Sequence, residues 1–195
     1  MKIAYLAARN SIHTVRWVNE LAARSHEVHL ISMHHGGDML HPKVNVYYLP
    51  IGSPLGYFLN VSSLRYLLGK IQPDLLHAHY ASGYGTLGRL CAFHPFILSV
   101  WGSDVYIFPF QTLVNKWLVK KNLLSADWVC STSKAMAEQT RWLCPSIKRL
   151  SITPFGIDTE VFSPREALSD PNIITVGTIK NLAPQYGIDI LIRAF

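Results

Sequence analysis

The sequence predicts an α/β protein built on a Rossmann-like, doubly wound parallel sheet. Short apolar runs typical of strands alternate with longer segments in which apolar residues recur at helical spacing. The segments between successive strands are long enough for the helical crossover that parallel neighbours need. The composition agrees, because 49% of the 195 residues are hydrophobic and only 15% are charged, which is enough apolar material for a sizeable core.

The N-terminal part of the chain begins this alternation. Residues 2–8 are an apolar run typical of a buried strand, and Val15, Val18 and Ala22 then fall on one helical face. Ser11 precedes that face and is a residue type that favours a helix N-cap. By the same criteria we predict helices at 13–24 and 62–71 and further strands at 27–33, 44–49 and 74–79.

The alternation continues as far as residue 143, with Ser133 as a candidate N-cap for the last helix of this part. The predicted helices are 86–93, 111–124 and 134–143, and the predicted strands are 96–101 and 127–131.

The sequence changes character after Pro154. Residues 154–171 are polar and contain several prolines, which is typical of a linker between domains. A strand is then predicted at 172–176 and the opening of a helix at 186–195. Because one strand and part of a helix cannot bury themselves, we expect residues 1–165 to form one domain. Residues 166–195 would be the linker and the start of a truncated second α/β domain.

Charge and cysteine content exclude several classes of protein. The formal net charge is +6, but the basic residues are scattered and form no recognised nucleic-acid module, so we expect no nucleic-acid partner. Three cysteines without CxxC spacing favour a reducing compartment over a disulfide framework. The apolar run at 3–8 is short for a signal peptide, and Pro and Gly interrupt the uncharged stretch 44–64. We therefore expect a cytoplasmic protein that does not span a membrane.

The residues that follow each predicted strand are the first candidates for a site, because doubly wound sheets bind ligands beyond the carboxyl ends of their strands. Arg9 and His13 follow the first strand, where a helix N-terminus favours anionic or hydroxyl-bearing ligands. The alternative is a solvated loop with an ordinary serine cap. Asp104 follows the strand 96–101 and is suited to binding a hydroxyl or orienting a general base, or to capping the next segment.

Three glycines suggest a second kind of ligand. Gly83, Gly85 and Gly88 match the G-x-G-x-x-G spacing of a dinucleotide-binding loop, and Asp104 stands roughly where a ribose-binding acid belongs.

The histidines predict no metal site. His77 and His79 alternate onto one face of a strand but lack a third ligand at a recognisable spacing, so we expect His77 to be packed in the core. His34, His35 and His41 lie in a polar stretch and are expected at the surface.

The segment after residue 104 suits a membrane surface. Residues 105–110 are strongly apolar, and the predicted helix 111–124 carries Lys116, Lys120 and Lys121 among apolar residues. A basic amphipathic helix of this kind can lie on an anionic bilayer. A helix packed on the sheet with a solvated lysine edge is the alternative.

A series of short motifs also occurs in order along the chain. The most specific are Pro-Asp-Leu-Leu-His-Ala-His-Tyr at 73–80, Trp-Gly-Ser-Asp-Val at 101–105 and Ile-Thr-Pro-Phe-Gly-Ile-Asp at 152–158, with others at 1–5, 13–22, 25–31, 126–134 and 176–195. Together they span almost the whole chain. In this order the motifs resemble those of glycosyltransferase family 4 enzymes, which have the two-domain GT-B fold.

That resemblance implies a retaining transferase whose N-terminal domain binds the acceptor and whose C-terminal domain binds a nucleotide-sugar donor. We expect a glycan or lipid-linked acceptor, and the lipid part of this expectation rests on the basic amphipathic helix alone. The resemblance implies no metal or other cofactor, and most of the donor-binding half is absent from this chain, so we expect the fragment alone to be inactive. The expected location is cytoplasmic and peripheral to the inner face of a membrane. The residues that the resemblance implicates are Asp104 as catalytic, Ser11, His13, Arg16, His79, Tyr80 and Lys116 as acceptor-binding, and Gly177 and Lys180 as donor-binding.

The chain departs from the family pattern at several positions. Trp101 stands where many relatives carry histidine, and Thr178 and Tyr186 stand where relatives often carry the Arg and Lys that neutralise the donor diphosphate. Lys180 is the cation left nearby. Two other functions stay open at this point, a dinucleotide-dependent oxidoreductase or epimerase that uses the Gly83–Gly88 loop, and a non-catalytic sugar-binding module.

Overall fold

The computed structural model describes residues 1–163 and 173–195, which form two compact units, Met1–Gly156 and Ile157–Phe195. The predicted domain boundary at 165/166 lies outside the described residues. The elements in chain order are β1 (Lys2–Leu6), α1 (Ile12–Ala23), β2 (Glu27–Ser32), β3 (Val44–Tyr48), α2 (Gly56–Leu59), α3 (Val61–Ile71), β4 (Leu75–His79), α4 (Gly83–Cys91), β5 (Phe96–Val100), α5 (Ser103–Tyr106), α6 (Phe108–Gln111), α7 (Leu113–Ser125), β6 (Trp128–Ser131), α8 (Lys134–Leu143), β7 (Leu150–Ile152), the 3-10 turn η1 (Pro184–Tyr186) and α9 (Ile188–Ala194).

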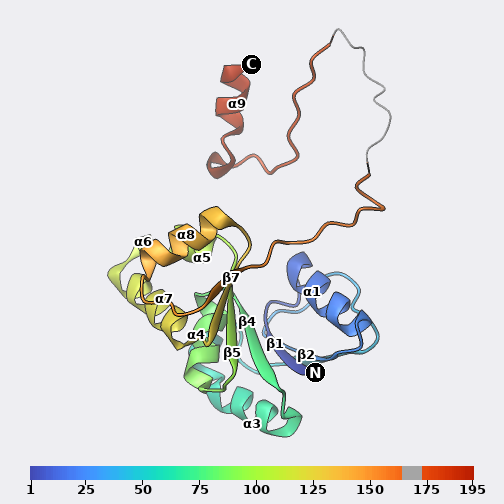
Figure 1. Cartoon of the computed structure of the whole chain (residues 1–195), viewed down its shortest axis with the longest axis vertical. Coiled ribbons are helices and arrows are strands. Elements are labelled where there is room, and N and C mark those ends of the chain that lie inside the picture. Colours follow the sequence, from blue (N-terminus) through green and yellow to red (C-terminus); the bar gives the residue numbers. More distant parts are fainter. Residues whose placement is uncertain (164–172) are drawn as a thin grey trace. The chain divides into compact units, whose positions relative to one another are not determined.

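The strands of the first unit form one parallel sheet in the order β3-β2-β1-β4-β5-β6-β7 (Figure 1). The chain builds outward from β1 to β3, crosses back to β4 beside β1, and then builds outward in the other direction. This arrangement confirms the predicted fold class, an α/β protein with a Rossmann-like doubly wound sheet.

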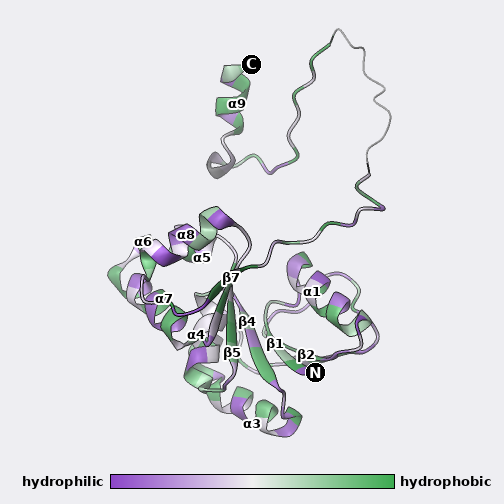
Figure 2. Cartoon of the chain, in the orientation of Figure 1, coloured by the Kyte–Doolittle hydropathy of each residue, from purple (hydrophilic) through white to green (hydrophobic). Residues whose placement is uncertain are grey.

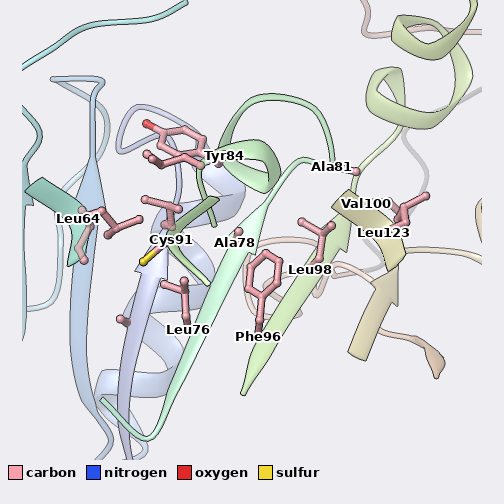
Figure 3. Close-up of a cluster of buried hydrophobic side chains, with 14 of the residues drawn as sticks. Leu64, Leu76, Ala78, Ala81, Tyr84, Cys91, Phe96, Leu98, Val100 and Leu123 are labelled. Atoms are coloured by element: carbon pink, nitrogen blue, oxygen red, sulfur yellow. The ribbon is translucent and has the colours of Figure 1, made fainter. Parts of the chain in front are cut away.

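Apolar side chains cover both faces of the sheet, as expected for buried parallel strands. Helix α1 packs on one face through Val18 and Ala22. Helices α3, α4 and α7 pack on the other face through Leu64, Leu87 and Leu123, and Figure 3 shows part of this larger core. Figure 2 shows that β5, an interior strand between β4 and β6, is strongly hydrophobic.

The helix starts follow local capping chemistry. The hydroxyl of Thr112 accepts a hydrogen bond from the backbone N–H of Asn115 at 3.0 Å, and that of Ser133 accepts one from Met136 at 3.2 Å. These residues begin α7 and α8. Ser11 occupies the N-cap of α1 with extended backbone, but its side chain makes no capping hydrogen bond.

Several elements differ from the prediction. Helix α4 begins at Gly83 rather than at residue 86, and two one-turn helices, α5 and α6, precede α7. The sequence does not predict strand β7. Its three residues are too few to show an alternating pattern, and they directly follow the charged residues Lys148 and Arg149. Residues 173–176 of the predicted strand 172–176 are not a strand, because a lone strand has no neighbour with which to form a ladder, and Asn172 lies outside the described residues. Across residues 1–163 and 173–195, no helix combines the length and apolarity that crossing a bilayer requires.

Candidate functional site

The carboxyl edge of the sheet brings together the loops that follow β1, β4 and β5, which are neighbouring strands. The order of the strands reverses between β1 and β4, and doubly wound sheets bind their ligands at such a switch point. Ser11 and His13 lie after β1, His79 and Tyr80 lie at the end of β4, and Asp104 lies after β5. The fold therefore places these predicted site residues at one edge.

Rings from these loops pack together in what we call the aromatic cluster, formed by His13, His79, Tyr80, Trp101 and Phe155. The imidazole of His13 stacks on the ring of Phe155, with 3.8 Å between centroids and 4° between planes. The indole of Trp101 lies 4.2 Å from the His79 ring and 5.2 Å from the Tyr80 ring, measured between centroids. It also meets His13 and Phe155 edge-on. Trp101 is thus the centre of the cluster.

The two histidines of the cluster carry nitrogen atoms that are buried and, within the described part of the chain, have no hydrogen-bond partner: Nδ1 of His13 and Nε2 of His79. The other His79 nitrogen lies 3.4 Å from the hydroxyl of Thr14. Burial, helped by the neighbouring His77 and His13, holds the pKa of His79 well below its usual value. Burial and the charge of Arg16 lower the pKa of His13. Both imidazoles are therefore neutral near pH 7, and each can donate one hydrogen bond and accept another.

His77 lies beneath the cluster and is a packed core residue, as predicted. Its Nε2 is 2.8 Å from the hydroxyl of Ser99, and burial lowers the pKa of His77 to about 3. Residues 1–163 and 173–195 contain no group of three or more His, Cys, Asp or Glu side chains arranged for a metal ion.

Asp104 ties two loops of the site together. Its side chain is 1% exposed, and one carboxylate oxygen accepts the backbone N–H of Ala81 at 2.8 Å. The other oxygen accepts those of Trp101 at 3.1 Å and Gly102 at 2.8 Å. Burial raises the pKa of Asp104, and these backbone hydrogen bonds oppose that rise. Both oxygens of the carboxylate thus accept hydrogen bonds from backbone N–H groups. These hydrogen bonds hold the loops that carry Tyr80 and Trp101.

Asn122 of α7 supports the same β4 loop from a second side. Its amide nitrogen donates to the carbonyl oxygens of Ala81 and Ser82 and lies 2.8 Å from the Thr86 hydroxyl. Its amide oxygen accepts from Nε of Arg89 at 2.7 Å. A fully buried amide with all of these partners holds the loop rigidly.

A cavity of about 350 Å³ opens beside the aromatic cluster, within the size range of small-molecule sites. We call it the tyrosine cavity, after Tyr57, Tyr80 and Tyr84 in its wall. Helices α5 and α6 and the residue between them form part of the remaining wall. The other lining residues are Ala8, His34, Ser82, Gly83, Ser103, Asp104, Ile107, Phe108 and Gln111.

His34 corrects a sequence expectation. It was expected at the surface, but its ring is partly buried in the wall of the tyrosine cavity and its Nδ1 lies 2.8 Å from the hydroxyl of Tyr84. The hydroxyl of Tyr84 also accepts the backbone N–H of Met33 at 2.9 Å. His34, Tyr57, Tyr84 and Phe155 were missed because they come from separate segments that only the folded chain brings together.

The Gly83–Gly88 segment does not fit a dinucleotide-binding loop. It lies within helix α4, and each glycine faces a close neighbour. A Cβ on Gly83 would approach the ring of Tyr57 to 2.4 Å, and one on Gly88 would approach the ring of Phe96 to 2.7 Å. These glycines allow a helix to pack tightly, and no open phosphate cradle forms there.

The remaining predicted residues are more scattered. Arg16 is exposed on α1, with its guanidinium 3.3 Å from the carbonyl oxygen of Gly156. Lys116 does not line the tyrosine cavity and lies over the rings of Phe110 and Trp142, 5.9 Å from each centroid.

The two predicted donor-binding residues belong to the unit Ile157–Phe195. Among the described residues, and apart from Gly177 and its two chain neighbours, no atom lies within 4 Å of the place where a side chain on Gly177 would begin. Lys180 is exposed, and its ammonium lies 5.4 Å from the centroid of the Tyr186 ring.

Comparison with known proteins adds a family and a fold. Residues 2–133 match the family described as glycosyl transferase 4-like. No curated protein sequence matches the chain significantly. Among solved structures, sucrose-phosphate synthase from Thermosynechococcus elongatus superposes with a TM-score of 0.66 at 16% identity, covering 85% of this chain and 50% of that one.

Two further structures are similar. Anabaena HepE, in complex with UDP and glucose, has a TM-score of 0.59 and 12% identity over 85% of this chain and 47% of that one. The S. aureus MnaA–UDP co-structure has a TM-score of 0.59 and 20% identity over 95% of this chain and 50% of that one. The chain thus shares its fold with these proteins and spans about half of their length.

Proposed function

Because the chain belongs to the glycosyl transferase 4-like family, we propose that it is the acceptor-binding part of a retaining glycosyltransferase. The enzyme would move a sugar from a nucleotide-sugar donor to a glycan or lipid-linked acceptor, with no resident metal or cofactor. The similar HepE structure holds UDP and glucose and the MnaA structure holds UDP, which supports a donor of the UDP-sugar class.

The observation that carries the acceptor assignment is the aromatic cluster beside the tyrosine cavity, at the switch point of the sheet. Ring faces such as those of Trp101 and Tyr80 offer flat apolar surfaces, and a pyranose ring presents such a surface on one face. The neutral imidazoles of His13 and His79 each have a buried nitrogen that lacks a partner. An acceptor hydroxyl would satisfy them, and unsatisfied buried polar atoms are otherwise costly.

The other predicted residues take supporting roles in this proposal. Ser11 and Arg16 flank His13 at the start of α1, where free backbone N–H groups and positive charge favour hydroxyl or anionic groups of the acceptor. Asp104 acts as a positioning residue, because its carboxylate holds the loops that carry Tyr80 and Trp101. Lys116 does not line the tyrosine cavity and takes no part in this acceptor site.

The donor would bind to the second unit. Lys180 is exposed and can meet the diphosphate of a nucleotide-sugar, and Gly177 leaves room for a close approach to the backbone. Cys91, Cys130 and Cys144 are all free and buried, which supports the proposed cytoplasmic location.

Tryptophan fluorescence tests the acceptor site. The chain is titrated with a panel of methyl glycosides and short oligosaccharides, and we expect saturable quenching from Trp101. The Trp101→Phe variant should lose the signal. The matched control is Trp128→Phe, because Trp128 lies on β6 outside the cluster and is partly exposed.

Two results would count against the proposal. One is the absence of a saturable response to every glycoside in the panel. The other is a ligand signal that survives in Trp101→Phe and disappears in Trp128→Phe, which would place the sugar elsewhere. Circular dichroism confirms that both variants remain folded.

A further inference from the structure

Helices α5, α6 and α7 and the end of α8 carry an unusual number of exposed apolar side chains. We call this surface the lysine–aromatic face. Leu113 is 86% exposed and Trp117 is 55% exposed, although residues of both types are usually buried or nearly so. The other large apolar members are Tyr106, Ile107, Phe110, Val114 and Trp142.

The charged residues of the face between positions 105 and 126 are all cationic. Residues 105–126 contain Lys116, Lys120 and Lys121 and no Asp or Glu. Lys121 lies one helical turn after Trp117, and Lys120 one turn after Lys116. Figure 2 shows hydrophobic and hydrophilic residues side by side along α7.

Lysine ammonium groups and aromatic rings lie close together on this face, as they do in proteins at the interface between lipid and water. The ammonium of Lys116 lies 5.9 Å from the ring centroids of both Phe110 and Trp142, within the range of cation–π attraction. Lysine stems lie along apolar surface while their charges stay in water. Trp and Tyr are the residues that collect at the headgroup level of membranes.

We propose that the lysine–aromatic face docks on an anionic lipid bilayer, with its apolar side chains in the headgroup region and its lysines on lipid phosphates. Charge complementarity selects this occupant. A protein interface is ordinarily depleted in lysine relative to the rest of the surface. Over residues 105–126 this face combines aromatic residues with lysine and has no carboxylate, which is the composition of an interfacial membrane surface.

The tyrosine cavity adjoins this face. Ile107 belongs to both, and Phe108 and Gln111 of the cavity wall alternate along the chain with Phe110 and Leu113 of the face. Docking would therefore hold the mouth of the cavity at the membrane surface. This consequence rests on the proposed function and narrows the acceptor to one with a sugar headgroup on a lipid, whereas the docking itself does not depend on the transferase activity.

Vesicle sedimentation tests the docking without any sugar or nucleotide. The probes are large unilamellar vesicles of phosphatidylcholine alone and of phosphatidylcholine with phosphatidylglycerol in equal amounts. We expect the chain to sediment with the mixed vesicles at low salt and to be released as salt shortens the screening length from about 10 Å at 0.1 M to about 3 Å at 1 M. Much weaker binding is expected to phosphatidylcholine alone.

Paired variants locate the contact. Leu113→Glu/Trp117→Glu should abolish sedimentation. The control Met39→Glu/Tyr66→Glu makes the same change of charge at apolar side chains that are 89% and 62% exposed outside the face, and should bind like the wild type. Lys120→Gln/Lys121→Gln should lower the partition coefficient about fivefold per lysine, and Lys43→Gln/Lys70→Gln only slightly.

Each other result overturns the proposal. If the wild type binds neither kind of vesicle, the face is not a membrane surface. If both glutamate variants bind equally well, the contact lies elsewhere. If sedimentation velocity without lipid shows a dimer that only Leu113→Glu/Trp117→Glu dissociates, the occupant is a second copy of the chain. Thermal unfolding of all four variants, at temperatures near that of the wild type, shows that the changes leave the fold intact. Failure of glycoside binding, with vesicle binding retained, would count against the transferase site alone.

Discussion

Individual residues at the carboxyl edge act mainly by fixing backbone. The sequence predicted that His79, Tyr80 and Asp104 would meet there, because residues that end neighbouring parallel strands share an edge. It did not predict that Asp104 would join two loops, because one of its backbone donors, Ala81, lies 23 residues away along the chain, whereas Trp101 and Gly102 are its near neighbours.

Replacing Asp104 by Asn should therefore destabilise the fold. The side-chain amide of Asn would place its own N–H group against a backbone N–H group, so that one hydrogen bond is lost together with the negative charge. We expect this change to lower the free energy of unfolding by about 1–3 kcal/mol. Urea denaturation measures this cost. The control is Asp38→Asn at an exposed carboxylate, which should change the free energy of unfolding by less than about 0.5 kcal/mol. If the two variants were equally stable, the hydrogen bonds that Asp104 accepts from the two loops would not stabilise the fold.

Buried neutral histidines make the fold sensitive to acid. The pKa of His77 is about 3 in the folded chain, against a usual value of 6.5, so the unfolded chain binds more protons below pH 6.5. Stability is fully present above that value and is lost as the pH falls towards 3. At about pH 5 the loss from His77 alone is about 2 kcal/mol.

Urea denaturation at a series of pH values tests this expectation. His79, whose pKa is also lowered, acts in the same direction, so His77→Asn should flatten the pH dependence but not remove it. Parallel stability curves for the wild type and His77→Asn between about pH 7 and pH 5 would show that His77 does not contribute.

At the scale of the elements, the alternation of strands and helices could be predicted, because apolar residues recur at helical spacing in the helices that connect the strands. Short elements without periodicity could not be. Helices α5 and α6 occupy an apolar run in which no helical face stands out, and β7 has only three residues, held as an edge strand by β6. The glycines of α4 were misread, because their spacing also matches a loop motif and their packing partners are distant in sequence.

The close packing of α4 gives an element-scale prediction. Gly88→Ala should destabilise the fold by about 1–3 kcal/mol, because the new Cβ meets the ring of Phe96. Gly69→Ala on α3 is the matched control. Outside its own helix backbone, no atom of the described residues lies within 4 Å of its Cβ position, so helix propensity should make the variant more stable by up to about 1 kcal/mol. Chemical denaturation compares the two. Stabilisation of both would contradict the tight contact between α4 and β5.

For the molecule as a whole, the family was predictable from the ordered motifs and the Rossmann-like fold from the alternation of strands and helices, while the ligand of the candidate site was not. Side chains from the aromatic cluster and the tyrosine cavity define what can bind, and they come from at least six segments of the chain. The donor residues predicted in 173–195 lie in a unit where no residue of α9 is buried, so neither the sequence nor that unit defines a donor pocket.

This chain spans about half of the length of the structures that it matches. We therefore expect it to bind acceptor glycosides but to catalyse no transfer by itself. Release of UDP from a panel of UDP-sugars, with and without the best-binding glycoside, measures turnover. Sustained release by the purified chain would show that these residues hold a complete active site, whereas glycoside binding without release is the expected outcome.

The way in which Asp104 holds the site also bears on how its specificity can be redesigned. The carboxylate of Asp104 accepts hydrogen bonds only from backbone N–H groups, so these bonds do not depend on which side chains the donor residues carry. Position 101 can then be randomised in a library while its loop keeps its backbone conformation, so that new glycan preferences are selected on an unchanged scaffold. The same library built on Asp104→Asn should lose most of its folded members.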